Sequence, residues 1–343
     1  MNLTNKYSQK AFDVYKQLIQ RGSAYDVNII REKVTGSEKD QAGLEPTLMR
    51  LYTRSIERKK VLAGKDNSER TIQKYNRCKK HLAEFLEKHY GTDDIRFNHI
   101  TLQFVEDFEV HLKTEGNCCH DTTMKHIQTF KTIYRTATAH GYTDRDPFQK
   151  YRIRMEEVVR AYLTEQEIQT LIKLELPSEK LETVRDLFVF SCFTGLAYVD
   201  LKGLCAKHIH FENNKYWIRT RRQKTNVRTN VPLLKTPLEL IQKYCPDFMS
   251  IDENEPLFKV ISNQKVNKNL KELAKEAKIS KPLTFHIARH TFATSVTLNN
   301  GVPIESVSTM MGHKHISTTQ NYAKMLDKKL EEDMDKLGRK LTY

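Results

Sequence analysis

Long apolar runs are missing from this sequence of 343 residues. Nowhere do about 18 consecutive apolar residues occur, which excludes a membrane-spanning helix. The first residues contain no apolar segment of the kind a secretory signal needs, so no such signal is expected. The six cysteines are scattered and form no disulfide framework, which favours the reducing cytoplasm. Low-complexity segments and internal repeats are also absent.

Acidic residues are too few to balance the basic ones. Lys and Arg number 57 against 43 Asp and Glu, which gives a net charge of +14. Hydrophobic residues make up 38% and aromatic residues 9%, enough for folded cores, so a disordered basic tail is excluded. A basic protein of this kind most often binds nucleic acid, although ribosome-associated proteins and merely basic enzymes share the composition.

Turn-rich, charged stretches at residues 62–68 and 143–157 divide the chain into three parts. We expect residues 1–62 to form a helical arm, or the remnant of a larger N-terminal DNA-binding domain. Residues 63–150 are expected to form a helical domain, and residues 158–343 a mixed domain. The arm is too short and too polar for a core of its own. Its two amphipathic segments are residues 10–20 and 45–60.

Helical periodicity runs through almost all of residues 68–142. Helices are expected after Ser68, over residues 102–112 and over residues 122–139. The apolar positions that share a face in this part are Leu82, Phe85, Leu86, Met124, Ile127, Phe130 and Ile133. Lysines and arginines line the other faces; singly they are typical of solvated surface, but together they fit a helical module that grips a phosphate backbone.

Short β-rich runs interrupt a helical pattern in the last part of the chain. Residues 208–211, 216–220 and 229–232 are separated by turn signals, which predicts a small three-stranded antiparallel sheet. A capping box at Thr164 opens a helix before the sheet. The further helices expected in this part are residues 181–194, 263–278, 285–299, 304–311 and 317–337. The fold class is therefore mainly α with a small antiparallel β-sheet.

Residues suited to phosphodiester chemistry gather in this last part. His286 and Arg289 lie one turn apart on a predicted helix, and His313 follows Gly312 at the end of another. Tyr322 comes nine residues after His313, and Lys224 lies in the turn between the second and third strands.

A tyrosine hydroxyl has a pKa near 10 and attacks only a strongly activated target. A phosphodiester is such a target when Arg and His donors hold its non-bridging oxygens. A lysine on a flexible turn can protonate the leaving 5′-oxygen. We therefore expect Tyr322 to attack DNA, giving a 3′-phosphotyrosine and a free 5′-hydroxyl. Because the ester retains the bond energy, strand exchange needs neither ATP nor metal, and no cofactor is expected.

These residues resemble the tyrosine recombinase (phage-type integrase) family. The likeness is carried by residues 194–201 (Thr-Gly-Leu-Ala-Tyr-Val-Asp-Leu), Lys224, His286-x-x-Arg289, Gly312-His313 and Tyr322. It covers residues 68–330, and residues 190–200 and 222–225 look like the branch found on conjugative transposons and related mobile elements. The resemblance implies a helical, SAM-like core-binding domain and a mixed α/β catalytic domain that form a C-shaped clamp on DNA.

One position departs from the family pattern. After Thr-Gly-Leu the family normally places its first catalytic arginine, and this chain has Ala197. Losing one such donor typically costs about 10²- to 10³-fold in rate. Arg222 is the favoured replacement, since a strand would send its side chain to the same face as Lys224. Arg185, twelve residues before Ala197, is the other candidate. Several integrases of this branch also lack the first arginine. The resemblance further implies that Asp200 orients basic residues of the site rather than reacting.

Other histidines and cysteines invite different interpretations. His286 and His290 have the i, i+4 spacing that can hold zinc, but no glutamate base lies between them and Arg289 lies beside them. Residues 118–120 (Cys-Cys-His) have no second ligand pair, so ordinary loop residues are favoured and no metal site is expected. His290 and His315 are also interpretable as packing residues.

Apolar residues recur every three or four positions near the C-terminus, at Leu326, Leu330, Met334, Leu337 and Leu341. This stripe needs a partner, either its own domain or, as the resemblance suggests, a neighbouring subunit.

The function predicted is a cytoplasmic site-specific DNA recombinase that acts on inverted core half-sites through a Holliday junction. It would assemble into a tetramer on DNA through its C-terminal helix, with possible accessory DNA-bending proteins as partners and no membrane. Alternatives are a relaxing type IB topoisomerase and a non-catalytic DNA-binding accessory protein, the latter suggested by Ala197. The expected catalytic residues are Tyr322, Arg289, His286, His313, Lys224 and Arg222.

Overall fold

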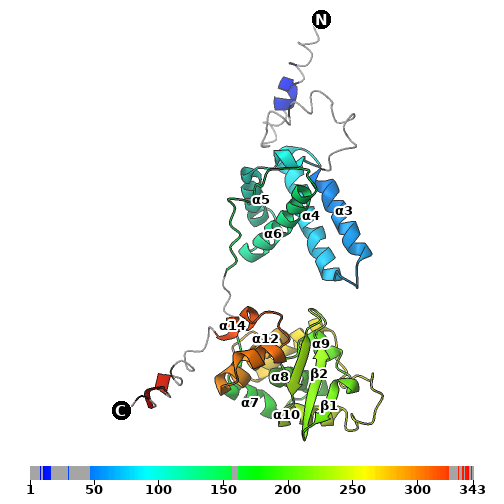
Figure 1. The fold of residues 1–343 in the computed structure, drawn as a ribbon, viewed down its shortest axis with the longest axis vertical. Coiled ribbons are helices and arrows are strands. Elements are labelled where there is room, and N and C mark those ends of the chain that lie inside the picture. Colours follow the sequence, from blue (N-terminus) through cyan, green and yellow to red (C-terminus); the bar gives the residue numbers. More distant parts are fainter. Residues whose placement is uncertain are drawn as a thin grey trace. The chain divides into compact units, whose positions relative to one another are not determined.

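The chain divides into two compact units, Met1–Val158 and Val159–Tyr343. The computed structural model describes residues 8, 11–16, 30, 47–156 and 161–323, and residues 331, 334, 335, 337–339 and 341 near the C-terminus (Figure 1). Within these residues no helix is long and apolar enough to cross a membrane.

The first unit is helical. Its elements are α3 (Leu48–Val61), α4 (Glu69–Tyr90), η1 (Phe97–His99), α5 (Leu102–Thr114) and α6 (His120–Ala139). Ser68 begins α4, because its hydroxyl accepts a hydrogen bond from the Thr71 amide, and Gly91 ends it in the left-handed conformation at φ 60°. Thr101 caps α5 in the same way as Ser68 caps α4.

Aromatic side chains form the centre of this unit. The ring of Phe85 on α4 contacts Phe104 and Phe108 on α5, and the ring of Phe130 on α6 contacts Phe148. All the apolar positions predicted to share a face here are buried, and the predicted helices are confirmed. The core also includes residues that precede the break at residues 62–68: Leu48, Leu51, Tyr52 and Ile56, all on α3. The apolar face of α3 therefore packs into the core of the helical unit, and α3 does not form a separate arm.

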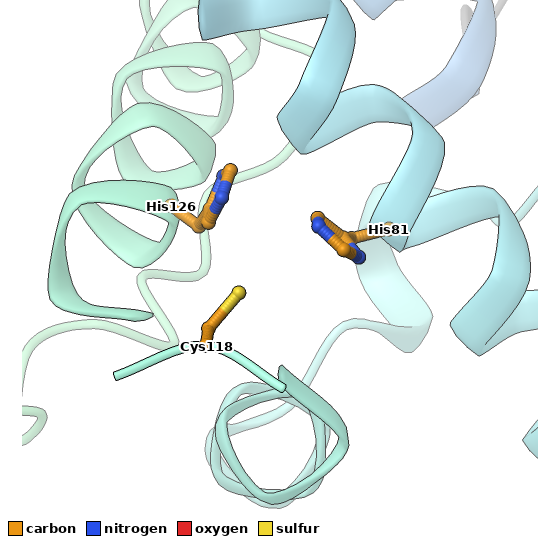
Figure 2. Close-up of side chains that lie close together, drawn as sticks. All are labelled: His81, Cys118 and His126. Atoms are coloured by element: carbon orange, nitrogen blue, oxygen red, sulfur yellow. The ribbon is translucent and has the colours of Figure 1, made fainter. Parts of the chain in front are cut away.

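The loop between α5 and α6 brings distant polar residues together. Cys118 of this loop lies beside His81 of α4 and His126 of α6, and the three side chains point toward one another (Figure 2). Of the expected helix over residues 10–20, residues 11–16 are helical and the remainder lies outside the described residues.

The second unit combines helices with one sheet. Its elements before and within the sheet are α7 (Glu165–Lys173), α8 (Glu179–Thr194), α9 (Tyr198–Lys202), η2 (Ala206–His208), β1 (Ile209–Glu212), β2 (Lys215–Arg221) and β3 (Arg228–Pro232). Those that follow are α10 (Lys235–Tyr244), α11 (Asn263–Glu276), α12 (Phe285–Thr291), η3 (Phe292–Thr297), η4 (Leu298–Asn300), α13 (Ile304–Met310) and α14 (Ser317–Ala323).

Helix α8 is buried around most of its surface, and α7, α10, α11 and α12 pack against it. The sheet has the order β1-β2-β3 and is antiparallel throughout, as predicted. Asn213 and Asn214 take positive φ values of 49° and 58° in the β1–β2 turn, the conformation that two-residue hairpins require. The mainly helical fold class with a small antiparallel sheet is confirmed.

The helix expected over residues 285–299 is not continuous. It starts as α12 but widens into a π-helical turn over η3 and tightens into the 3₁₀ turn η4. The Thr297 hydroxyl donates to the carbonyls of Phe292 and Ala293, so a side chain competes for the backbone acceptors of this turn. Helical periodicity in sequence does not distinguish such a widened turn from a regular one.

Candidate active site

Arg289 lies at the centre of the candidate site. Its side chain is only 3% exposed on α12, and it donates hydrogen bonds to the carbonyls of Gly195 and Met311. Gly195 ends α8 with φ 69°, and a Cβ there would lie 2.4 Å from the Phe292 ring. The end of α8 therefore packs closely against the start of η3, and the guanidinium of Arg289 is held between the Gly195 and Met311 segments.

His313 contacts Arg289 through one ring nitrogen and Thr319 through the other. Its Nε2 lies 3.1 Å from Arg289 Nη2, and its Nδ1 lies 2.8 Å from Thr319 Oγ1. A guanidinium only donates, so Nε2 must accept and Nδ1–H must donate to the threonine hydroxyl. The two partners together define the tautomer of His313 in this state.

Tyr322 is buried beside these residues, with 7% of its surface exposed. Its ring lies parallel to that of His313 at 6.1 Å between centroids, and the ring of His290 lies 5.0 Å away. Helix α14 carries both Thr319 and Tyr322 three positions apart, so one helical face delivers both side chains to the site.

His286 reaches the cluster through His290. His286 is exposed on α12, and its ring contacts that of His290 edge-on at 4.7 Å. His290 is 8% exposed and lies between His286 and Tyr322. The structure therefore brings His290 into contact with Tyr322. The sequence alone leaves it undecided whether His290 is a packing residue.

Arg222 enters the site from the loop that joins β2 to β3. Its Nη1 donates to the Gly312 carbonyl at 3.4 Å, and its Nε lies 3.9 Å from Asp200 Oδ2 on α9. Asp200 also accepts a hydrogen bond from the Gln223 amide at 2.9 Å, which holds this loop. The prediction that a strand aligns Arg222 with Lys224 is wrong, because β2 ends at Arg221 and the loop turns back at Asn226. Lys224 is exposed in this loop.

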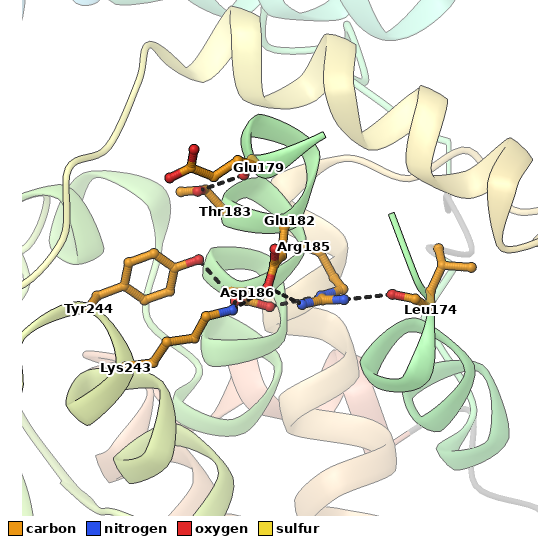
Figure 3. A network of polar contacts seen from close by, with 8 residues as sticks. All are labelled: Leu174, Glu179, Glu182, Thr183, Arg185, Asp186, Lys243 and Tyr244. Atoms are coloured by element: carbon orange, nitrogen blue, oxygen red, sulfur yellow. Dashed lines mark hydrogen bonds and ion pairs between the residues drawn. The ribbon is translucent and has the colours of Figure 1, made fainter. Parts of the chain in front are cut away.

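Arg185 lies in a different network (Figure 3). Its guanidinium pairs with Asp186 at 2.8 Å and donates to the Leu174 carbonyl at 2.7 Å. Lys243 and Tyr244 of α10 bind the other oxygen of Asp186. These contacts tie α8 to α10 and to the end of α7, so Arg185 serves packing between helices, and Arg222 is the candidate that joins the cluster.

The positive charges of Arg289 and Arg222 repel one another in this cluster. Burial lowers the pKa of Arg289 to about 10 and the charge of Arg222 adds to the effect, while Tyr322 and Asp200 oppose it. Burial also lowers the pKa of His313 to about 4, again with contributions from Arg289 and Arg222. A buried guanidinium and a partly buried one beside a neutral histidine form a site suited to an anion.

Basic hollows occur on both units. One, of about 420 Å³, is lined on α4 and α6 by residues that include Lys74, Lys131 and Arg135. The other, of about 500 Å³, lies on the sheet, where Arg219, Arg221 and Arg228 line it. Both are suited to phosphate oxygens, which arginine and lysine side chains bind without reading base sequence.

A helical unit and a mixed unit that brings together arginine, histidine and tyrosine define a class of protein, the tyrosine recombinases. Two family models match the chain: the phage integrase family over residues 161–329 and the phage integrase SAM-like domain over residues 47–153. The chain belongs to the phage integrase family, whose members are site-specific DNA recombinases, and the resemblance found in the sequence is confirmed.

Relatives and solved structures agree with this assignment. Tyrosine recombinase XerD of Halalkalibacterium halodurans is 26% identical over 275 residues, covering 77% of this chain and 89% of that protein. XerD of Staphylococcus aureus is 26% identical over 293 residues, 80% of this chain and 93% of its own length.

Among solved structures, the Tn1549 transposon integrase in complex with transposon right end DNA gives a TM-score of 0.62 at 18% identity. That match covers 81% of this chain and 94% of the integrase. A lambda integrase dimer bound to a COC′ core site also gives 0.62, at 19% identity, over 81% of this chain and 95% of that one. These two likenesses show that the fold is shared.

Proposed function

We propose that this recombinase cuts and rejoins DNA through a 3′-phosphotyrosine at Tyr322. One observation carries the proposal: the buried tyrosine lies against His313, which contacts the guanidinium of Arg289, with Arg222 beside it. A scissile phosphate bound there would lie next to a nucleophile and two permanent cations. These donors act where negative charge develops, which makes them most effective in the transition state.

Each residue has a defined part in the proposed reaction. Arg289 and Arg222 hold the non-bridging oxygens, and His286 adds a donor at the exposed end of the cluster. The phosphate's charge raises the pKa of His313 and favours its donor form. The Tyr322 oxygen forms a bond to phosphorus as the bond to the 5′-oxygen breaks, and Lys224 gives that oxygen a proton. The phenolic proton leaves to a base in the site or to water.

The reverse step seals the strand. A 5′-hydroxyl attacks the phosphotyrosine, the bond to Tyr322 breaks and the DNA phosphodiester re-forms. The ester retains the energy of the bond that was cut, so the reaction consumes no ATP. The arginines and Lys224 supply the charge and the proton that catalysis requires, and we propose that no metal ion takes part.

The proposed substrate is duplex DNA with inverted core half-sites, bound by a tetramer that exchanges strands through a Holliday junction in the cytoplasm. A lambda integrase tetramer bound to a Holliday junction shares the fold, with a TM-score of 0.59. Met334, Leu337 and Leu341 of the C-terminal stripe are exposed, which supports docking on a neighbouring subunit. Leu326 and Leu330 lie outside the described residues. The C-shaped clamp and accessory DNA-bending proteins belong to the same proposal.

A nicked suicide duplex tests the cutting step. The core site is first selected from a random duplex pool by binding. A nick placed a few nucleotides 3′ of the cleavage point then lets the short fragment that carries the free 5′-hydroxyl diffuse away, so that the strand cannot be resealed. The intact chain should accumulate a covalent adduct that Tyr322→Phe does not form. A wild-type chain that binds the site tightly without any adduct would favour the accessory-protein alternative that Ala197 suggests. Relaxation of a plasmid without a core site would favour the topoisomerase alternative.

A further inference from the structure

Three metal-ligating side chains converge inside the helical unit, away from the candidate active site. His81 lies on α4, Cys118 in the α5–α6 loop and His126 on α6, and one ligand atom of each lies within 4.8 Å of the others (Figure 2). The sequence separates these residues and gives no second ligand pair for Cys118, so only the fold brings them together.

His126 has a polar atom that the protein leaves unsatisfied. Its side chain is 7% exposed, and its Nδ1 is buried without a hydrogen-bond partner among the described residues. A buried polar atom left without a partner destabilises the folded state, so a ligand at this point would remove that penalty.

The chain is shaped to present Cys118. Gly116 follows α5, where a Cβ would lie 2.7 Å from the Leu112 carbonyl oxygen, and Asn117 takes a positive φ of 46°. The amide of Cys118 then donates to that same Leu112 carbonyl at 3.0 Å. This tight turn places the half-buried thiol beside the two histidines, where it also lies 3.4 Å from the Gly116 carbonyl.

We propose that His81, Cys118 and His126 bind a Zn²⁺ ion that joins α4, α6 and the α5–α6 loop. One thiolate and two imidazoles are ligands that zinc prefers. Ligand atoms around a tetrahedral zinc ion lie about 3.3–3.6 Å apart. Side-chain rotations that move the three ligand atoms by about an ångström would therefore complete the site. Glu84 Oε2 lies 3.4 Å from His81 Nδ1 and can orient that ring.

A second group, His89, His111 and Glu115, is a weaker candidate. The ammonium of Lys88 already pairs with Glu115 at 2.6 Å, and the same carboxylate contacts His111 at 3.1 Å. A cation beside the only anionic ligand opposes a second cation. The group is therefore an ion-pair network that closes the end of α5.

Titration of the metal-free full chain with Co²⁺ and then Zn²⁺ tests the site. The wild type should bind about one Co²⁺ with the visible bands of tetrahedral coordination and a thiolate charge-transfer band, and Zn²⁺ should displace it. Zn²⁺ should also raise the melting temperature, because it binds the folded state. Cys118→Ser should lower the affinity more than about tenfold, abolish the thiolate band and remove the thermal shift.

Cys119→Ser is the matched control, since Cys119 is the neighbouring cysteine in the same loop but is exposed and contacts Thr122. It should bind Zn²⁺ as the wild type does. His126→Asn should lose binding, with circular dichroism as the check that it is folded. A wild type that binds no more tightly than Cys118→Ser, or a Cys119→Ser variant that loses binding equally, would overturn the proposal. Neither result depends on DNA cleavage.

Discussion

The guanidinium of Arg222 comes to the site from a loop, whereas the family places its first arginine where this chain has Ala197. Asp200, one turn after Ala197, lies 3.9 Å from Arg222 Nε, so Arg222, which we propose as the replacement, approaches the candidate site beside α9. The two arginines weighed from the sequence thus differ in their surroundings: Arg222 neighbours Arg289, and Arg185 pairs with Asp186.

Substituting each arginine separates these roles. Arg222→Ala should lower the rate of covalent adduct formation by about 10²- to 10³-fold, because one oxyanion donor is removed. Arg185→Ala should lower the free energy of unfolding by about 1–3 kcal/mol and leave that rate unchanged in the folded protein, because it removes hydrogen bonds between helices. Adduct kinetics and urea unfolding measure the two effects. Equal rates in both variants would contradict the assignment of Arg222.

In the proposed reaction Thr319 acts through His313, as a positioning residue. Thr319→Val removes the hydroxyl that accepts from His313 Nδ1, a bond worth about 1 kcal/mol, so adduct formation should slow about fivefold. Thr319→Ser should restore the rate. Thr318→Val, at the exposed neighbouring position, should match the wild type. The kinetics are measured at saturating DNA; a Thr319→Val variant with the wild-type rate would remove Thr319 from the account.

Sequence patterns indicate the candidate catalytic residues more readily than the residues that contact and position them. Tyr322, His313 and Arg289 stand out by type and spacing, and the structure brings them together. Thr319 and His290 act through contacts between α12, α14 and the segment after α13, which no local pattern contains. The one available signal for Thr319 is its position three residues before Tyr322 on the same helix.

The turn that follows α13 depends on a glycine. Gly312 has φ 59°, and a Cβ there would lie 2.4 Å from Thr229 Oγ1 and 2.8 Å from Arg222 Cδ. Gly301 has φ 79°, but a Cβ there would meet no atom within 4 Å. Both glycines therefore need the left-handed backbone conformation, but of the two only Gly312 borders the candidate site.

Alanine at each position distinguishes backbone strain from displacement of the site. Gly301→Ala should lower the free energy of unfolding by about 1–2 kcal/mol and leave adduct formation intact. Gly312→Ala should cost at least as much stability and should also slow the reaction, because Arg222 must move. Chemical denaturation and adduct kinetics measure both quantities. A Gly312→Ala variant that reacts at the wild-type rate would show that Arg222 tolerates the shift.

Local sequence signals predict secondary structure well where the residue types themselves determine the local backbone conformation or the buried face. The Thr164 capping box, the Asn-Asn hairpin and the apolar faces of α4 and α6 all form as expected. The π-helical turn at η3 depends on Thr297 reaching earlier carbonyls, and the end of β2 depends on Asp200 binding the loop after Arg221. The π-helical turn and the end of β2 are both set by specific hydrogen bonds, which the periodicity of the sequence does not reveal.

The net charge of +14 is distributed over both units. The hollow on α4 and α6 and the hollow on the sheet place basic side chains at the surface, whereas Arg289 is buried at the candidate site. The surface cations should contribute to affinity for any duplex, and the buried one to catalysis at a single phosphate.

Salt dependence tests this division. The logarithm of the duplex affinity should fall linearly with the logarithm of salt concentration, and Lys74→Gln combined with Arg135→Gln should reduce the slope by about two. Lys80→Gln is the control, because Lys80 lies on the same helix but pairs with Glu84. Fluorescence anisotropy measures the binding. An unchanged slope in the double variant would exclude the α4–α6 hollow as a DNA contact.

The central claim is that Tyr322 becomes covalently attached to a 3′-phosphate. The most direct measurement is mass spectrometry of the peptides released from the trapped adduct after nuclease digestion. We predict that the residual nucleotide is attached to Tyr322 and to none of the other 14 tyrosines in the chain. A nucleotide on a different residue, or an adduct of undiminished yield from Tyr322→Phe, would contradict the account.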